Sequence, residues 1–380
     1  MGKVLFVATV VKTHIMQFHI PYLKMFKEMG WETAVAARND YDDTNKCVIP
    51  YCDIYYDLSF ARNPFKPANL KAYKLLKKII SDGRYDIIHC HTPVGGVIGR
   101  LAAKSARKNG TRVFYTAHGF HFFKGAPLLN WLLYYPVEKL CSRITDVLIT
   151  INHEDYELAL KKMKAKRVEY IPGVGIDTEK FAGTQVDRAA KRREIGVPEN
   201  AFVLISVGEL ITRKNHQIVI KAVAEIGNKD LHYVIVGQGI LKNQLQQLAE
   251  KLNVADRVHF LGYRTDVAEL NKTSDVFCFP STQEGLPVAL MEAMACGLPV
   301  ICSDIRGNTD LIEDGVGGYL FDSNNIDLLK SAILNICNGS MRAKNFEERN
   351  FNIISNFDFN NINQMMKKLY FSPPKEGEKI

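Results

Sequence analysis

Residues 280–300 read PSTQEGLPVALMEAMACGLPV, and this stretch combines a loop, a helix and the start of a strand. The apolar run 276–279 before it has the character of a buried strand, and the chain then becomes polar. Leu286 and Pro287 are expected to open the helix, because a proline in the first turn loses no intrahelical hydrogen bond. Gly297 is expected to end the helix, and the next strand is expected to begin at Val300. The order strand, loop, helix, turn, strand is that of a parallel α/β domain.

Two carboxylates flank the start of the predicted helix. Glu284 lies in the loop before it, and Glu292 lies in its second turn. Unpaired N–H groups and the positive end of the helix dipole suit a phosphate at such an N-terminus. Glu284 could then accept sugar hydroxyls above the phosphate and Glu292 could accept hydroxyls beside it, as a sugar and a ribose on a diphosphate would require. On spacing alone, two solvated acids explain the pattern equally well.

The rest of the chain alternates apolar runs with helical patterns. Strands are predicted at 4–9, 33–37, 86–90, 113–117, 147–150, 203–207, 233–236, 258–260, 276–279 and 300–302. Helices in the first half are predicted at 16–29, 68–81, 95–108, 128–142 and 154–163. The alternation and the length of 380 residues predict two doubly wound parallel α/β domains. Ligands of such sheets bind beyond the carboxyl ends of the strands, so the residues that follow each strand are the candidates for function.

Composition indicates a cytoplasmic globular protein. Hydrophobic residues make up 47% of the chain and charged residues 24%. The eight cysteines form no C-x-x-C pair, so neither disulfides nor a cysteine zinc site is expected. The first residues look like a strand rather than a signal peptide, and no apolar run approaches the roughly 20 residues of a membrane span.

The positive charge is concentrated in the first half of the chain. Residues 1–172 contain 26 Lys and Arg against 15 Asp and Glu, a net charge of +11, and the remainder has 23 against 26, a net charge of −3. A basic half predicts an anionic partner. A membrane surface or a lipid-linked phosphate fits better than nucleic acid, for which no recognition signature is present. A basic surface that is merely solvated remains the alternative.

The aromatic segment 120–135 invites a more specific prediction about a lipid interface. It reads FHFFKGAPLLNWLLYY. We expect its helical part to belong to the core and the tip 122–124 to insert shallowly into a lipid interface.

Histidines follow several strands of the first half. The motifs H-x-H at 89–91 and H-x-x-H at 118–121 resemble metal-binding spacings, but no carboxylate or cysteine cluster accompanies them, so no metal is predicted. His118 stands between a strand end and a glycine, where its neutral imidazole could bond a sugar hydroxyl. The candidates for the acceptor side are His14, His19, His91 and His121. Surface histidines at a helix start are the open alternative for the first two.

Basic residues follow the first strand of the second half. Gly208 begins a turn that contains Arg213 and Lys214, and cations at a strand-to-helix turn are well placed to hold a phosphate. Tyr263 and Arg264 follow another strand. The segment at 236–240 has two glycines of the Rossmann fingerprint and lacks the third, which argues against a nicotinamide cofactor.

Three motifs carry a resemblance to one family. The sequence EGLPVALMEAMACGLPV at 284–300 is similar, nearly residue for residue, to the signature of the family-4 retaining glycosyltransferases. The turn from Gly208 to Lys214 resembles the G-R-L-x-x-x-K motif of this family, with Glu209 in place of the arginine and Arg213 as a candidate replacement. Residues 171–181 resemble its interdomain linker. The resemblance is to the capsular and exopolysaccharide enzymes of the family.

The resemblance implies the GT-B fold, in which two Rossmann-like domains face a central cleft. The expected domains are 1–171 on the acceptor side and 172–357 on the donor side, with a helix at about 358–371 that packs back on the first domain. The implied catalytic residues are His118, Lys214 and Glu284. The implied donor-binding residues are Gly208, Arg213, Lys214, Tyr263, Arg264, Glu284, Gly285, Leu286, Pro287, Val288 and Glu292.

The resemblance also implies a reaction. A sugar would move with retention from a nucleotide diphosphate, UDP by resemblance, to a glycan acceptor that is carried on a polyprenyl diphosphate or lies near the membrane. Neither metal nor cofactor is implied, and the enzyme would lie in the cytoplasm at the inner face of the cell membrane. Two other functions stay open, a nucleotide-sugar 2-epimerase of the same fold and a non-catalytic subunit that only binds nucleotide sugar.

Overall fold

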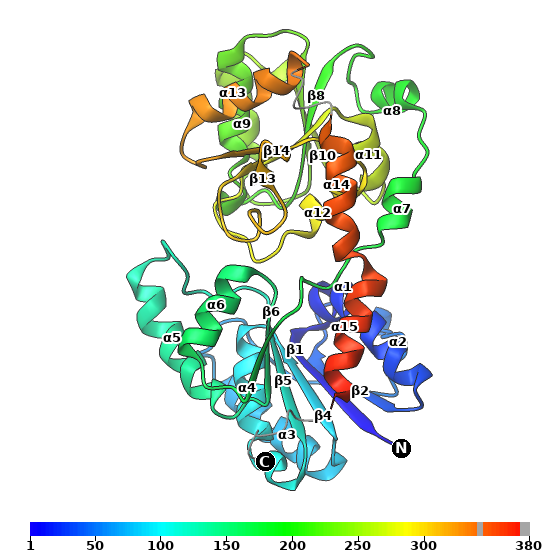
Figure 1. Ribbon diagram of the computed structural model, residues 1–380, viewed down its shortest axis with the longest axis vertical. Coiled ribbons are helices and arrows are strands. Elements are labelled where there is room, and N and C mark those ends of the chain that lie inside the picture. Colours follow the sequence, from blue (N-terminus) through cyan, green and yellow to red (C-terminus); the bar gives the residue numbers. More distant parts are fainter. Residues whose placement is uncertain (340–344, 373–380) are drawn as a thin grey trace. The chain divides into compact units, whose positions relative to one another are not determined.

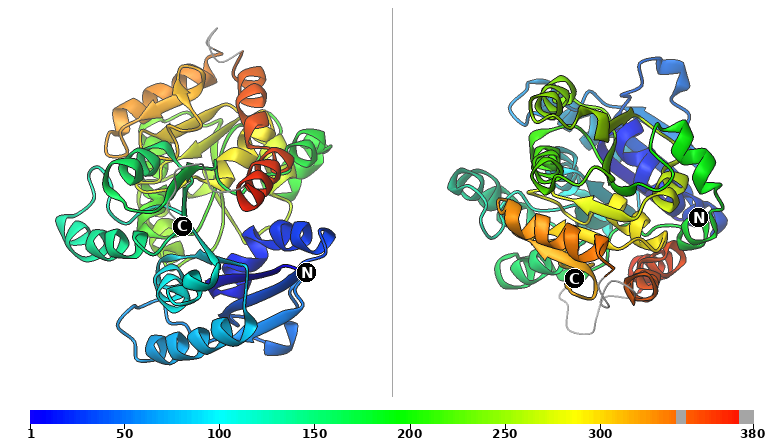
Figure 2. Two further views of the ribbon diagram at one scale, coloured as in Figure 1. Left: turned by 60° about the horizontal axis from the view of Figure 1, so that its bottom comes forward. Right: turned by 90° about the horizontal axis from the view of Figure 1, so that it is seen from above.

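The computed structural model describes residues 1–339 and 345–372, and the chain forms two compact units (Figure 1). One unit contains Met1–Val174 together with the chain from Ile362 onward, and the other contains Gly175–Asn361. The boundaries expected from the sequence lie at 171/172 and 357/358. Figure 2 gives two further views in which the same units can be followed by colour.

The first unit is built on a parallel seven-stranded sheet with the order β3-β2-β1-β4-β5-β6-β7. Its strands are β1 (Lys3–Val10), β2 (Glu32–Arg38), β3 (Ile54–Asp57), β4 (Ile87–His91), β5 (Arg112–Ala117), β6 (Val147–Thr150) and β7 (Arg167–Tyr170). Its helices are α1 (Met16–Phe18), α2 (Ile20–Glu28), α3 (Ala68–Gly83), α4 (Pro93–Ala103), α5 (Leu128–Ser142) and α6 (His153–Lys162), and a π-helical turn at Val11–Ile15 follows β1.

Alternate residues of β1 enter the two cores of this unit. Leu5 and Val7 pack in the cluster that α3, α4 and α6 cover, whereas Val4 and Phe6 pack with α2 on the opposite face. This is the expected consequence of the two-residue period of a strand that is buried on both faces.

The last helix, α15 (Phe359–Phe371), completes the core that contains Val4 and Phe6. Ile362, Met366 and Leu369 are buried there, and Figure 1 shows α15 beside α2. The hydroxyl of Tyr370 lies 2.5 Å from Nδ1 of His89, and the guanidinium of Arg112 donates to the carbonyl oxygen of Tyr370. The end of the chain is therefore held by both apolar and polar contacts.

The second unit has its own parallel seven-stranded sheet, in the order β10-β9-β8-β11-β12-β14-β13. Its strands are β8 (Phe202–Val207), β9 (Leu231–Val236), β10 (Val258–Gly262), β11 (Val276–Phe279), β12 (Val300–Ser303), β13 (Glu313–Asp314) and β14 (Gly317–Phe321). Its helices are α7 (Thr178–Gly183), α8 (Arg188–Glu194), α9 (His216–Ile226), α10 (Lys242–Lys251), α11 (Val267–Thr273), α12 (Val288–Ala295), α13 (Ile326–Cys337) and α14 (Phe346–Ile354).

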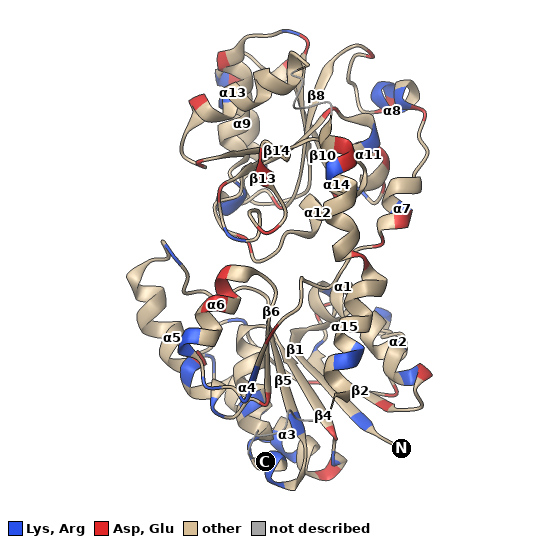
Figure 3. Ribbon diagram, in the orientation of Figure 1, with Lys and Arg blue, Asp and Glu red and all other residues tan. Residues whose placement is uncertain are grey.

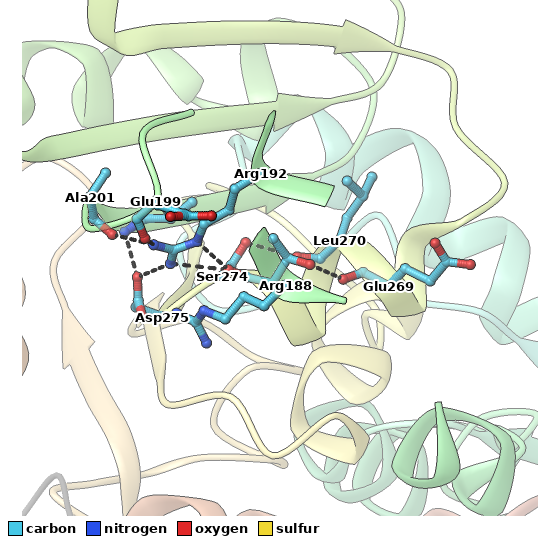
Figure 4. A network of polar contacts seen from close by, with 10 residues as sticks. Arg188, Arg192, Glu199, Ala201, Glu269, Leu270, Ser274 and Asp275 are labelled. Atoms are coloured by element: carbon cyan, nitrogen blue, oxygen red, sulfur yellow. Dashed lines mark hydrogen bonds and ion pairs between the residues drawn. The ribbon is translucent and has the colours of Figure 1, made fainter. Parts of the chain in front are cut away.

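A buried arginine ties α8 to the start of this sheet (Figure 4). The guanidinium of Arg192 donates to the carbonyl oxygens of Thr273 and Ala201 and lies 2.9 Å from Oδ2 of Asp275. The same oxygen of Asp275 accepts from the backbone N–H of Val203, at 2.8 Å. Because Arg192 is only 3% exposed, these partners are needed to satisfy its buried donors.

Most predicted strands lie within one or two residues of the observed ones, and β3, β7, β13 and β14 have no counterpart among the ten predicted ranges. The strand β3 shows the reason. This strand pairs only with β2, at the edge of its sheet, and has the short sequence IYYD. Tyr51, just before it, has a φ of 60°, and the nearby chain is polar. Such a short edge strand carries too weak an alternation to be recognised from the sequence.

Helix α5 differs from the expectation for the aromatic segment. Leu128, Leu129 and Leu132 are 74%, 61% and 64% exposed, whereas Phe122 of the predicted lipid-inserting tip is fully buried. The predicted lipid contact is therefore wrong for Phe122, and the predicted core position of the helix is confirmed only for the side with Trp131, Tyr134 and Tyr135. The helix buries one side only, and the segment before it folds inward. Among the described residues, no helix is both long and apolar enough to cross a membrane.

A buried ion pair holds the inner side of α5 against α4. Nη2 of Arg100 lies 2.8 Å from Oε1 of Glu138, and Nε of Arg100 donates to the carbonyl oxygen of Gly96 at 2.8 Å. The guanidinium also stacks over the ring of Tyr115, at 3.7 Å from the ring centroid. Arg100 is fully buried and Glu138 is 8% exposed, so each charge depends on the other.

Candidate functional site

The candidate site of the second unit lies where the strand order reverses. From β8 the chain continues to β9 and β10 on one side of the sheet, and it then returns to β11, β12 and β14 on the other. In open α/β sheets, ligands bind at such a switch point, beyond the carboxyl ends of the strands. The loops that follow β8 and β11 contain Lys214 and Glu284, and these strands are direct neighbours.

The structure brings the two basic residues and the first carboxylate together. Nζ of Lys214 lies 2.8 Å from Oε1 of Glu284, and Nη1 of Arg213 lies 3.0 Å from the same oxygen. The side chains of Lys214 and Glu284 are only 11% and 10% exposed, whereas Arg213 is 44% exposed. Burial lowers the pKa of Lys214, and the neighbouring Glu284 acts in the opposite direction. A carboxylate thus lies between two cations at this position, and Glu209 is a further negative charge near Lys214.

Neighbouring loops fix the position of the Glu284 loop. Nε of Arg306 donates to the carbonyl oxygen of Glu284 at 3.2 Å, and the backbone N–H of Thr282 donates to the carbonyl oxygen of Arg213 at 2.7 Å. Gly307 has a φ of +80°, and a Cβ there would lie 2.2 Å from the carbonyl oxygen of Gly285. Only glycine allows this approach, so the loop after β12 packs directly on the backbone beside Glu284.

The helix that follows this loop begins slightly later than predicted. Helix α12 starts at Val288, and Pro287 stands immediately before it with a ψ of 112°. Proline still suits this position, because it has no N–H that would need a partner. Gly285 and Leu286 belong to the loop that leads into the helix, so their backbone is near the N–H groups that α12 leaves without intrahelical partners.

The second carboxylate lies in α12 in a different environment from the first. Glu292 is partly buried, and burial raises its pKa to about 7, although Lys180 opposes the shift. A carboxyl group with this pKa is close to half protonated at neutral pH. It can therefore serve as a donor or an acceptor toward a hydroxyl group.

Of the other predicted donor-binding residues, Gly208 packs against the side chain of Lys214, whereas Tyr263 is largely exposed and Arg264 is paired with other residues. Gly208 packs on Lys214, since an added Cβ would lie 3.3 Å from its Cε atom. Tyr263 is 73% exposed, and Arg264 pairs with Asp266 and with Glu194 on α8. The guanidinium of Arg264 is thus engaged within the protein.

Four of the predicted histidines form one cluster in the first unit, which we call the histidine cluster. It consists of His14, His19, His91 and His118. One ring nitrogen of each residue can be chosen so that all four atoms lie within 4.8 Å of one another. His14 and His19 follow β1, His91 is the last residue of β4, and His118 follows β5. The strand order of this sheet reverses between β1 and β4. The cluster therefore occupies the switch point of the first sheet.

Burial makes the histidine cluster electrically neutral. Desolvation lowers the pKa of His14, His19 and His91 well below the usual value and that of His118 to about 4. Within the described chain, Nε2 of His14, both ring nitrogens of His19 and Nε2 of His91 are buried without a hydrogen-bond partner. Each such atom costs roughly 1–3 kcal/mol, so the group is expensive to maintain for packing alone.

The remaining predicted histidine lies outside this cluster. The ring of His121 stacks on that of Tyr134 in α5, with ring centroids 4.6 Å apart. His89, which was not predicted as a site residue, borders the cluster and has partners for both ring nitrogens, Tyr370 and Thr116. His89 is thus a satisfied core histidine, in contrast to His19.

Comparison with known proteins identifies the family. The family model described as Glycosyl transferases group 1 matches residues 187–352, and the model described as Glycosyl transferase 4-like matches residues 3–152. A protein of Bacillus subtilis (strain 168) named as glycosyltransferase EpsD is 45% identical over 322 residues, which cover 84% of this chain and 83% of that relative. This chain belongs to the group 1 glycosyltransferases.

Further relatives agree with this identification of a glycosyltransferase. The Escherichia coli enzyme named UDP-Gal:alpha-D-GlcNAc-diphosphoundecaprenol alpha-1,3-galactosyltransferase is 34% identical over 302 residues, 76% of each chain. The crystal structure of HepE from Anabaena in complex with UDP and glucose has a TM-score of 0.81 at 22% identity and covers 98% of this chain and 100% of its own. This likeness confirms the predicted GT-B fold.

Sequence reasoning missed two features of this glycosyltransferase. It did not predict that His14 and His19 would lie beside His91 and His118, because these residues are far apart in the sequence and share no local motif. It also did not anticipate the contact of Arg306 with the backbone of Glu284. For the first feature a signal existed, since residues after β1 and β4 must be neighbours if the first sheet is doubly wound in the usual order.

Proposed function

We propose that this glycosyltransferase transfers a sugar, with retention, from a UDP-sugar to a glycan acceptor carried on a polyprenyl diphosphate. The observation that supports the donor most directly is the pairing of Lys214 and Arg213 with Glu284 at the switch point of the second sheet. The two cations match a diphosphate, and the carboxylate matches the hydroxyls of the attached sugar. The acceptor rests on the E. coli relative, whose name specifies a diphosphoundecaprenol substrate.

The proposed mechanism assigns a separate task to each group. Lys214, Arg213 and the backbone N–H groups at the start of α12 stabilise the departing diphosphate, so no metal is required at this point. Glu284 holds hydroxyls of the donor sugar, Glu292 binds the ribose, and His118 contributes a neutral imidazole on the sugar side. The bond from the anomeric carbon to the diphosphate breaks while a bond to the acceptor oxygen forms on the same face. The proton of the acceptor hydroxyl passes to the diphosphate.

Release of UDP tests this function. Wild-type protein is expected to release UDP from one UDP-sugar of a panel only when lipid-linked acceptor from bacterial membranes is added. Glu284→Gln should lower kcat/KM about 10- to 100-fold, because hydrogen bonds to a charged group are worth roughly 1.5–3 kcal/mol. Glu250→Gln, an exposed change on α10, is the control. Donor binding without release under any condition would contradict the proposed transfer, and release that ignores the acceptor would point to epimerase chemistry.

The exposed side of α5 is the proposed contact with the membrane. Its leucines recur with the period of a helix and are accompanied by Val137 and Leu140, which are 42% and 61% exposed. Basic residues lie near both ends, Lys124 before the helix and Arg143 after it, within a unit whose surface is rich in Lys and Arg (Figure 3). Apolar side chains between basic ones are typical of a helix that lies in the interface of an anionic bilayer. Such a contact would bring the enzyme to a lipid-linked acceptor.

Vesicle binding tests the role of α5. Leu129→Glu/Leu132→Glu should weaken binding to vesicles of phosphatidylcholine and phosphatidylglycerol at least about tenfold, since burying two largely exposed leucines is worth roughly 2–4 kcal/mol. Leu160→Glu, at a 55% exposed leucine of α6, is the matched control and should bind like wild type. Co-sedimentation measures both. Equal binding by the double variant and the control would exclude α5 as the membrane contact.

A further inference from the structure

We propose that the histidine cluster of His14, His19, His91 and His118 is a binding site for a divalent late transition-metal ion, with Zn²⁺ as its natural occupant. This inference does not rest on the proposed donor or acceptor. It concerns the switch point of the first unit, whereas the diphosphate is assigned to cationic side chains of the second. It also revises the expectation of no metal, which considered only ligands close together in sequence.

The geometry of one histidine pair is that of two ligands on a common ion. Nε2 of His118 and Nδ1 of His91 are 3.4 Å apart. This distance is long for a hydrogen bond between two nitrogens. It equals the separation of about 3.4 Å between two nitrogens at the corners of a tetrahedron whose Zn–N bonds are about 2.05 Å. The two nitrogens form a long hydrogen bond with one another, and an ion bound between them would take its place.

The other two histidines complete a set of four donors. His19 lies against His91 with ring centroids 3.8 Å apart, and His14 lies against His118 with ring centroids 4.8 Å apart, so a common ion requires the first two rings to move out of this contact. The four chosen nitrogens fall within 4.8 Å, so the longest separation exceeds the tetrahedral edge by 1.4 Å, which rotation of the imidazoles can close. Four donors at such separations match a closed tetrahedral site.

The chemistry of the cluster favours a cation over a hydrogen-bonded core. A neutral imidazole carries a lone pair that can bind a metal ion. His19 is 1% exposed and has no partner for either ring nitrogen among the described residues. His89, beside it, shows what a structural histidine needs in this core, because both of its nitrogens are bonded. An ion would satisfy the donors that protein groups leave unpaired.

Two of the four ligands are less buried than the others. His19 and His91 are almost fully buried, while His14 is 8% exposed and His118 is partly exposed. The two less buried rings thus form the entrance. All ligands are imidazoles, and such sites prefer Zn²⁺, Cu²⁺ and Ni²⁺ to Mg²⁺ or Ca²⁺. Because Nε2 of His118 faces the cluster, a bound ion would leave the N–H on Nδ1, where it could donate to a further group.

Cobalt provides a spectroscopic test that does not depend on activity. Untagged full-length protein, stripped with a chelator, is titrated with Co²⁺, whose visible absorption reports tetrahedral coordination. We expect saturation at about one ion per chain, bleaching of the absorption when Zn²⁺ is added, and a higher melting temperature with Zn²⁺ than with chelator. Absence of the tetrahedral absorption in wild-type protein would overturn the proposal.

Single substitutions test whether the histidine cluster is the site that binds Co²⁺. His14→Gln and His118→Gln change the two less buried ligands and should each weaken Co²⁺ binding at least about 100-fold, with circular dichroism unchanged. His19→Phe removes the deepest ligand and provides an independent variant. His121→Gln is the control, because this histidine lies in the same unit and outside the cluster. If the folded cluster variants bind Co²⁺ as tightly as His121→Gln, the ion is held elsewhere and the proposal is wrong.

Discussion

Replacing Lys214 with alanine is expected to lower kcat/KM for sugar transfer about 10²–10³-fold, the loss that follows removal of one preorganised group from a developing negative charge. The leaving diphosphate gains charge as its bond to the sugar breaks. Lys214 is the more buried of the two cations, with its ammonium 4.4 Å from the centroid of the Phe279 ring and 2.8 Å from Glu284. In this partly desolvated position its charge is worth more than it would be at the surface. Steady-state kinetics with a saturating acceptor measure the effect.

Arg213→Ala serves as the comparison for this prediction. Arg213 is 44% exposed, so solvent screens its charge and the expected loss is smaller, about tenfold. Lys214→Arg should recover part of the activity, because the charge is retained. Melting temperatures should stay close to that of wild type in Arg213→Ala and Lys214→Arg, whereas Lys214→Ala leaves Glu284 with Arg213 as its remaining counter-charge. Activity of Lys214→Ala within about threefold of wild type would show that Lys214 does not contact the diphosphate in the transition state.

The fold was largely predictable from the sequence because its signals are local. Buried parallel strands are continuous apolar runs, and the helices between them have clear apolar periodicity. Two of the elements that were not predicted correctly, β3 and α5, also have physical explanations. The edge strand β3 lacks a run of buried apolar residues. The leucines of α5 have the sequence pattern of a core helix, because the local sequence does not determine which side of the helix faces the sheet. Hydrophobicity predicts that a face is apolar, but not what covers it.

The two candidate sites differ in how far the sequence could predict them. Lys214 and Glu284 could each be placed after a strand by local motifs, and the observed distance between them then depends on β8 and β11 being neighbours. The histidine cluster depends on the order of strands in the same way, but its members have no local motif in common. Strand order is fixed by tertiary packing. The residue types of the cluster could therefore be read from the sequence, but their assembly could not.

The second prediction of large effect concerns the buried ion pair between α4 and α5. Glu138→Ala should lower the free energy of unfolding of the first unit by about 3–5 kcal/mol. The change leaves the guanidinium of Arg100 buried without its counter-charge, and Nη1 of this arginine already has no hydrogen-bond partner among the described residues. The remaining bond from Nε to Gly96 and the contact with the Tyr115 ring do not neutralise it.

The chain allows this effect to be measured in the first unit alone. Its two tryptophans, Trp31 and Trp131, both belong to that unit, so their fluorescence during urea unfolding reports on it without a signal from the other. Glu157→Ala is the matched control, because Glu157 pairs with Lys161 on the exposed side of α6 and should contribute less than about 1 kcal/mol. Arg100→Met/Glu138→Leu removes both charges and should recover most of the stability. If Glu138→Ala unfolds at the same urea concentration as Glu157→Ala, the pair does not hold α5 in place, and the exposed leucine face of this helix would have to be positioned by other contacts of α5, such as those of Trp131 and Tyr134.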